Sequence, residues 1–148
     1  MDNEIKKDLA SNWFKLLQDA ICDNINKLEI IEPCGFHLSD KRFKRVVMDY
    51  IDLDKIEIHQ SADKFFEAKK NHRVILMTTK ASTSYLNFKF EKNDTILFGR
   101  ESAGVPENIH QSISDRLKIP MNKNTRSLNI ASSVAIVLAE SLRQTKLI

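Results

Sequence analysis

Cysteines are scarce in this sequence, and no stretch is long and apolar enough to suggest a membrane span. The 148 residues include two cysteines, Cys22 and Cys34, which lack the spacing of a metal or redox motif. We therefore expect reduced thiols in a cytoplasmic protein. No run approaches the roughly 18 apolar residues of a transmembrane helix, and the polar start at Met1–Glu4 predicts no secretory signal.

A large excess of charge of one sign is also missing. Charged residues make up 29% and hydrophobic residues 42% of the chain, which is typical of a soluble globular protein. The net charge of +3 permits RNA binding but does not require it. The length predicts a single domain over residues 1–148 that can bury a proper core.

Short apolar runs alternate with segments of helical periodicity. Residues 74–77 and 95–98 are almost wholly apolar, as expected for parallel strands buried on both faces. Further strands are predicted at 28–32, 55–59 and 117–120, and helices at 4–26, 39–50, 62–69, 107–112 and from about Ser127 onward. The last helix is expected to turn Leu128, Ala131, Val134, Ala135, Leu138 and Leu142 toward the core. This alternation predicts an α/β fold with a mainly parallel sheet.

Glycine and proline are rare, with three of each, and they gather where strands end. Gly99, Gly104 and Pro106 follow the apolar run that ends at Phe98. A glycine there allows a sharp turn and the close approach of a ligand, and ligands bind beyond the carboxyl ends of strands in open α/β sheets. The spacing alone leaves two interpretations equally open, a ligand loop or a plain tight turn.

Several common sites are missing. Gly99 and Gly104 have four residues between them, but Val105 and Pro106 follow where a phosphate-binding loop needs Lys and a hydroxyl residue. No Gly-x-Gly-x-x-Gly opens the first helix, and no metal-ligand cluster is visible. We expect the four scattered histidines to be surface or loop residues, namely His37, His59, His72 and His110.

Two ordered motifs carry a family resemblance. The segment 97–106, which reads LFGRESAGVP, resembles the second signature of the SpoU branch of the SPOUT superfamily. Residues 119–121 and 125–140 resemble the third signature, at the expected distance. Within that branch, residues 28–144 are similar to the small tRNA (cytidine/uridine-34)-2′-O-methyltransferases.

The resemblance implies a C-terminal trefoil knot, a homodimer, a tRNA substrate, no metal, and S-adenosylmethionine as methyl donor. By position, the cofactor contacts map to Met77, Gly99, Ile119 and Ser127, with Leu128 beside the adenine. Glu101 would brace the second loop, and Asn129 would anchor the pocket or face the ribose. A separate basic cluster, Lys41, Arg42, Lys44 and Arg45, is a candidate for tRNA phosphate contacts; a solvated helix face is nearly as good an explanation.

The family's first motif is not recognisable. Members have an N-terminal strand, an asparagine loop and a helix with an arginine that orients or activates the ribose hydroxyl. Here no arginine precedes Arg42, Asp19 stands near the expected position, and residues 1–27 read as one amphipathic helix. The catalytic residue is therefore unassigned, with Ser127 and Asn129 as supporting candidates.

Two alternatives to an active methyltransferase stay open. A degenerate paralogue would bind cofactor or tRNA but show absent or low turnover. An unrelated α/β nucleotide-binding module is the other.

Overall fold

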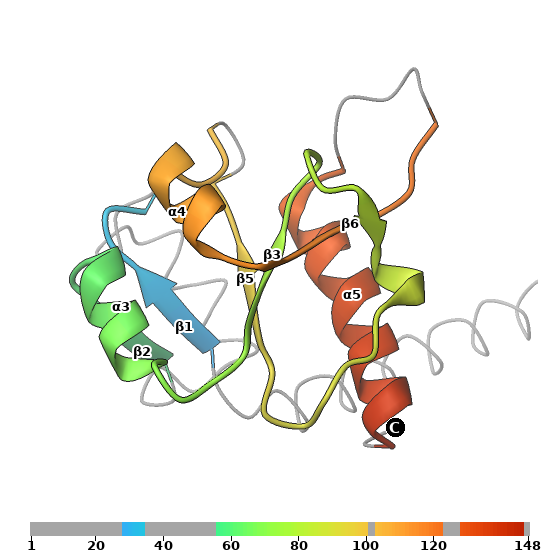
Figure 1. Ribbon diagram of the computed structural model, residues 1–148, viewed down its shortest axis with the longest axis horizontal. Coiled ribbons are helices and arrows are strands. Elements are labelled where there is room, and N and C mark those ends of the chain that lie inside the picture. The colour runs from blue at the N-terminus through green and yellow to red at the C-terminus, as the bar shows by residue number, and fades with distance from the viewer. Residues whose placement is uncertain (1–27, 35–55, 101–102, 123–127, 147–148) are drawn as a thin grey trace, which may run out of the picture.

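The computed structural model describes residues 28–34, 56–100, 103–122 and 128–146 (Figure 1). The elements in these ranges are β1 (Leu28–Ile31), β2 (Ile56–His59), α3 (Ala62–Ala68), β3 (Val74–Met77), β4 (Thr83–Ser84), the 3-10 turn η2 (Tyr85–Asn87), β5 (Thr95–Phe98), α4 (Glu107–Ser112), β6 (Asp115–Lys118) and α5 (Ile130–Thr145). None of the helices in these ranges has the length and apolar character needed to cross a membrane. The expected helices at 4–26 and 39–50 lie outside the described residues.

All strand pairs between the named strands are parallel, which confirms the α/β class with a mainly parallel sheet. Four strands pair in the order β4-β6-β3-β5, and β1 pairs with β2 in a second, two-stranded sheet. In Figure 1, α3 and α4 lie on one side of β3 and β5, and α5 lies on the other. The trefoil knot stays a prediction, because residues 123–127, which lead into α5, lie outside the described ranges.

The register of the sheet brings three strand ends together. Met77 pairs with Phe98 of β5 on one side and with Leu117 of β6 on the other. The amide of Thr78 then donates to the Leu117 carbonyl at 2.8 Å, which extends the β3–β6 pairing by one residue. Consequently the segments after β3, β5 and β6 all begin at the same edge of the sheet.

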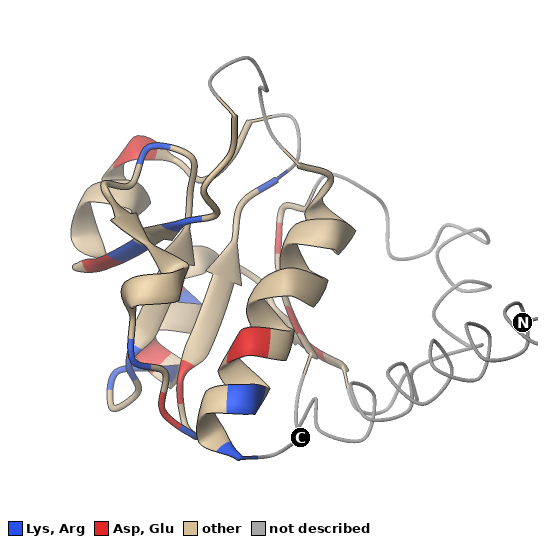
Figure 2. Ribbon diagram, turned by 90° about the vertical axis from the view of Figure 1, so that its right-hand side faces the viewer, with Lys and Arg blue, Asp and Glu red and all other residues tan. Residues whose placement is uncertain are grey.

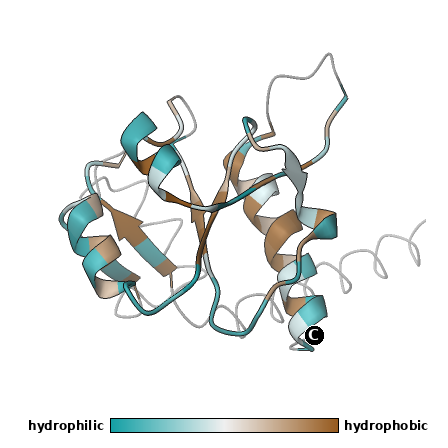
Figure 3. Cartoon of the chain, in the orientation of Figure 1, coloured by the Kyte–Doolittle hydropathy of each residue, from teal (hydrophilic) through white to brown (hydrophobic). Residues whose placement is uncertain are grey.

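The core forms around β3 and α5. Its buried cluster comprises Ile75, Met77, Phe90, Leu117 and Val137. Figure 3 shows brown, hydrophobic segments on the central strands and on α5. Removing such side chains from water is worth roughly 1.5–3 kcal/mol each. As expected, β3 is buried over most of its length. The 95–98 strand is instead only half-buried, because β5 is the end strand of the four-stranded sheet.

The predicted inner face of the last helix is partly wrong. Ala131 and Ala135 are exposed, and the buried positions of α5 are Val137, Ser141 and Leu142. The helix is held near its end by Gln144, whose Oε1 accepts the Phe90 amide at 2.9 Å and whose Nε2 donates to the Phe88 carbonyl at 3.0 Å. These contacts fix which side of α5 faces the sheet.

Two predicted boundaries also differ from the structure. The strand predicted at 117–120 runs from Asp115 to Lys118, since Asp115 and Arg116 pair with Ile75 and Leu76 despite their charge, while Pro120 has no amide to donate. The last helix begins at Ile130, three residues after the predicted start.

Candidate functional site

A cavity of about 360 Å³ lies at the sheet edge where β3, β5 and β6 end. This is within the size range of small-molecule sites, roughly 300–1,000 Å³. It is lined by Leu76, Met77, Thr78 and Thr79 at the end of β3; Phe98, Gly99, Arg100, Gly104 and Val105 at the end of β5; Ile119 and Met121 after β6; and Leu128, Ile130 and Ser133 at the start of α5. Apolar walls with a few hydroxyl groups can hold a ligand that is part aromatic ring and part polar chain.

The wall after β5 is a tightly closed loop. Arg100 and Gly104 form an antiparallel bridge, in which the Arg100 amide donates to the Gly104 carbonyl at 3.1 Å and the Gly104 amide returns a bond at 2.7 Å. A Cβ on Gly99 would lie 2.5 Å from the Gly104 carbonyl carbon and 2.8 Å from the Val105 nitrogen. Gly104 itself has φ +66°, which favours glycine. The two glycines therefore make a tight turn, and that turn forms one side of the cavity.

Four of the five predicted cofactor residues line this one cavity: Met77, Gly99, Ile119 and Leu128. The fifth, Ser127, lies outside the described residues, as does Glu101. The contacts of all five residues with a cofactor stay a prediction. The sequence assigned no role at the site to Thr78, Thr79, Arg100 or Ser133, although Thr78 and Thr79 share in the family resemblance. Thr78, Thr79 and Arg100 lie within two residues of the end of an apolar strand, and that position was the available signal.

Asn129 caps α5. Its Oδ1 accepts the Ala131 amide at 2.9 Å and the Ser132 amide at 3.4 Å, so the predicted helix start at Ser127 is wrong. The predicted anchoring role of Asn129 agrees with this geometry, because the first turn of α5 carries Ile130 and Ser133 into the cavity wall. A contact between Asn129 and a ribose stays a prediction.

Replacing Asn129 by alanine should destabilise the protein by about 1 kcal/mol, as for other N-cap deletions. Asn129→Asp keeps an oxygen acceptor and adds a negative charge at the helix N-terminus, so it should be neutral or slightly stabilising. Urea unfolding of both variants measures the difference. Equal losses from the alanine and aspartate variants would contradict the capping role.

Charged side chains are spread over the described surface. Figure 2 shows blue Lys and Arg segments in several separate places, with red Asp and Glu segments between them. Near the cavity, Lys80 lies 3.4 Å from Glu107 of α4. Hydrogen bonds from Gln111 and then Lys80 lower the pKa of Glu107. The basic cluster Lys41, Arg42, Lys44 and Arg45 lies outside the described residues.

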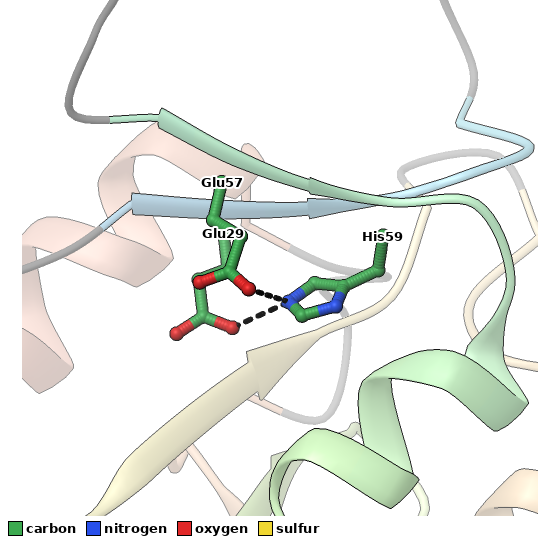
Figure 4. A group of neighbouring side chains, drawn as sticks. All are labelled: Glu29, Glu57 and His59. Carbon is green, nitrogen blue, oxygen red and sulfur yellow. Dashed lines mark hydrogen bonds and ion pairs between the residues drawn. The ribbon is translucent and has the colours of Figure 1, made fainter.

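A cluster of polar side chains joins β1 and β2, away from the cavity residues described above. Figure 4 shows Glu29, Glu57 and His59, whose potential ligand atoms all lie within 4.8 Å of one another. His59 Nε2 lies 2.7 Å from Glu29 Oε2 and 3.8 Å from Glu57 Oε1, and the other Glu29 oxygen accepts from Lys69. The prediction that His59 is a surface or loop residue is wrong, since it lies buried in a strand, 6% exposed.

A metal ion bound to this cluster would have to displace the Lys69 ammonium from Glu29. Lys69 and Glu29 are both largely buried, so their pairing already offsets the cost of burying the carboxylate. The edge of the His59 ring also meets the Phe65 ring, with centroids 5.3 Å apart. The arrangement therefore favours an ion-pair network over a metal site. This network fixes α3 to the β1–β2 sheet.

Comparison with known proteins defines the class to which this fold and cavity belong. The sequence model of the SpoU rRNA Methylase family matches residues 14–139, so the chain belongs to that family and the resemblance seen in the second and third motifs is confirmed. The resemblance noted in the sequence begins at Leu28, whereas the family model matches from residue 14. The match therefore includes about half of residues 1–27, in which no first motif is recognisable.

The relatives point more specifically to tRNA enzymes. The tRNA (cytidine(34)-2′-O)-methyltransferase of Ancylobacter novellus is 41% identical over 140 residues, covering 93% of this chain and 88% of that protein. A solved structure described as "Structural insights into the 2-OH methylation of C/U34 on tRNA" has a TM-score of 0.73 at 31% identity, covering 86% of this chain and 88% of that one. The methyltransferase AviRb from Streptomyces viridochromogenes, solved with AdoMet, shares the fold at 17% identity, with a TM-score of 0.69 and coverage of 86% and 55%.

Proposed function

We propose that this chain is a tRNA 2′-O-methyltransferase that uses S-adenosylmethionine and modifies the ribose of the wobble nucleotide. The observation that carries the proposal is the cavity at the ends of β3, β5 and β6, together with relatives over 40% identical that are named for this reaction. We further propose that residues 1–148 form one domain, that the protein works in the cytoplasm on tRNA, and that it does so without a metal.

The residues that line the cavity fit the cofactor. The apolar side chains of Phe98, Ile119 and Leu128 suit the faces of an adenine ring, and the hydroxyls of Thr78 and Ser133 suit polar groups of the ligand. When bound, S-adenosylmethionine supplies an electrophilic methyl group. The protein then has to hold the 2′-hydroxyl in line with it, keep water out and provide a route for the hydroxyl proton.

A homodimer is also part of the proposal. The side of α5 turned away from the sheet exposes Ala131, Ala135 and Ile136, and Ile136 is 36% exposed. Leu128, just before the helix, is 39% exposed. An apolar stripe of this kind, next to the cavity, suits contact with a second copy that completes the RNA site. Sedimentation equilibrium of the purified chain measures the oligomeric state.

The test of activity is the transfer of a tritiated methyl group to unmodified tRNA, with calorimetric titration of S-adenosylmethionine in parallel. We expect stoichiometric incorporation into tRNA and none into the same tRNA already 2′-O-methylated at nucleotide 34. Cofactor binding without incorporation would favour the degenerate paralogue, which the lack of an arginine before Arg42 supports. Absence of both binding and incorporation would contradict the assignment of the cavity.

A further inference from the structure

Arg100 is the one charged residue among the described residues that line the cavity. It lies two residues after Phe98, which ends β5, and so stands at the carboxyl end of the strand. Its own backbone is fixed by the two hydrogen bonds to Gly104, at 3.1 and 2.7 Å. A cationic side chain is thus carried by a rigid piece of backbone at the edge of the pocket.

The Arg100 side chain is exposed, and no acidic group in the described parts of the chain forms an ion pair with it. Two other cations in the described parts of the chain already have partners. Lys80 is paired with Glu107 at 3.4 Å, and Arg116 donates to the His110 carbonyl at 3.1 Å. Among the described residues that line the cavity, Arg100 is therefore the cation available to an incoming anion.

The chemistry of the acceptor identifies that anion. A ribose hydroxyl in RNA lies between two backbone phosphates, so any ribose brought to the cavity brings a phosphate close to its rim. A guanidinium binds phosphate with two parallel N–H···O bonds, which fixes orientation as well as adding affinity. Phosphate contacts of this kind set the register of a nucleic acid on a protein.

We propose that Arg100 binds the backbone phosphate beside the ribose that receives the methyl group, and so holds that ribose at the mouth of the cavity. This inference rests on the proposed function. The loop after β5 would then supply a positive charge next to the RNA. That charge matters here because the chain has no arginine before Arg42. The loop that closes one wall of the cavity would then serve both ligands, the cofactor through its backbone and the RNA through Arg100.

The test compares Arg100→Gln with Lys92→Gln. Lys92 is exposed and precedes β5, whereas Arg100 follows it, so both variants remove one positive charge at opposite ends of the same strand. For Arg100→Gln we expect S-adenosylmethionine affinity within twofold of the parent. Unmodified tRNA should bind about tenfold more weakly, and the slope of log affinity against log salt should flatten by about 0.7–0.9 units, the change for one lost phosphate contact.

Methylation kinetics give a second readout. Arg100→Gln should lower kcat/KM for tRNA at least as much as it lowers affinity, while Arg100→Lys should keep the parental salt slope and recover part of the rate, because the charge remains but the paired donors do not. Lys92→Gln should match the parent in every assay.

The outcomes separate this inference from the proposed function. An active parent whose Arg100→Gln variant binds and methylates tRNA like Lys92→Gln overturns the inference alone. Weaker binding of S-adenosylmethionine with unchanged tRNA binding overturns it too, and assigns Arg100 to the cofactor. A parent that binds tRNA through Arg100 but transfers no methyl group supports the inference and overturns the proposed activity, whereas a parent that does not bind tRNA overturns both.

Discussion

Replacement of Gly99 by valine is expected to weaken S-adenosylmethionine binding by about a hundredfold, and alanine should already weaken it by about tenfold. The cause lies in the protein backbone, since a Cβ at this position would meet Gly104 and Val105 at 2.5–2.8 Å. The sequence analysis gave the glycine a second use, the close approach of a ligand, which a side chain would also oppose. Because the neighbours are backbone atoms, no rotamer change can relieve the contact, and the Arg100–Gly104 bridge has to open.

The size of the effect follows from the cost of overpacking, typically about 1–3 kcal/mol. If the loop must close to bind the ligand, this cost appears as lost affinity, about tenfold for each 1.4 kcal/mol. Calorimetric titration with S-adenosylmethionine measures the loss. Urea unfolding shows whether the variant still folds, and a variant with a normal unfolding midpoint and no binding would locate the damage in the loop.

Gly104→Ala is the matched control. Nothing lies within 4 Å of the added methyl group, but the backbone has φ +66°, so the substitution should cost roughly 1–2 kcal/mol of stability. Its effect should therefore appear in the unfolding midpoint, with a smaller change in cofactor affinity than Gly99→Ala causes. Parental affinity in Gly99→Val would contradict the assignment of this loop to the cofactor site.

The parts of the fold that the sequence predicts well are those in which local pattern and tertiary environment agree. The apolar runs at 74–77 and 95–98 are strands at those same residues, and the 107–112 helix also has the predicted bounds. For β6 the local pattern and the tertiary environment disagree, because Asp115 and Arg116 are polar yet pair with β3 through their backbones. A hydropathy pattern cannot show that pairing.

The start of α5 shows a second limit. Ser127 and Asn129 are both favoured N-cap residues, and only the observed hydrogen bonds to Ala131 and Ser132 select Asn129. His59 shows the same limit over a longer distance. Its burial depends on Glu29, thirty residues earlier, and on the helix that presents Phe65, so no local spacing reveals it.

The residues that line the cavity were predicted mainly from the family resemblance, since the spacing of the glycines alone left a plain tight turn equally open. Two motifs located Gly99, Ile119 and Leu128, which lie far apart in sequence and line one site. Arg100 stands inside one of these motifs without having been singled out, because a sequence does not say which side chain of a loop borders a pocket.

The largest loss of stability is expected for a pair at the opposite end of β3 and β5. Arg73 precedes β3 and Asp94 precedes β5, and the guanidinium binds the carboxylate through two bonds of 2.7 Å. The Asp94 side chain is 3% exposed and also accepts the Glu91 amide at 2.7 Å. Hydrogen bonding by Asp94 raises the pKa of Arg73, so the guanidinium stays charged.

Arg73→Met should lower the free energy of unfolding by about 2–4 kcal/mol, because it leaves a buried carboxylate without its cation. The range lies below the full cost of a broken buried pair, since the Arg73 side chain is 33% exposed and water can enter the space it leaves. Arg143→Met removes a pair with the same two-bond geometry, but the Arg143 side chain is 67% exposed, so its loss should be much smaller than that of Arg73→Met. Urea midpoints at unchanged slope measure both losses. Equal losses would show that burial of the Asp94 carboxylate does not decide the energy of this contact.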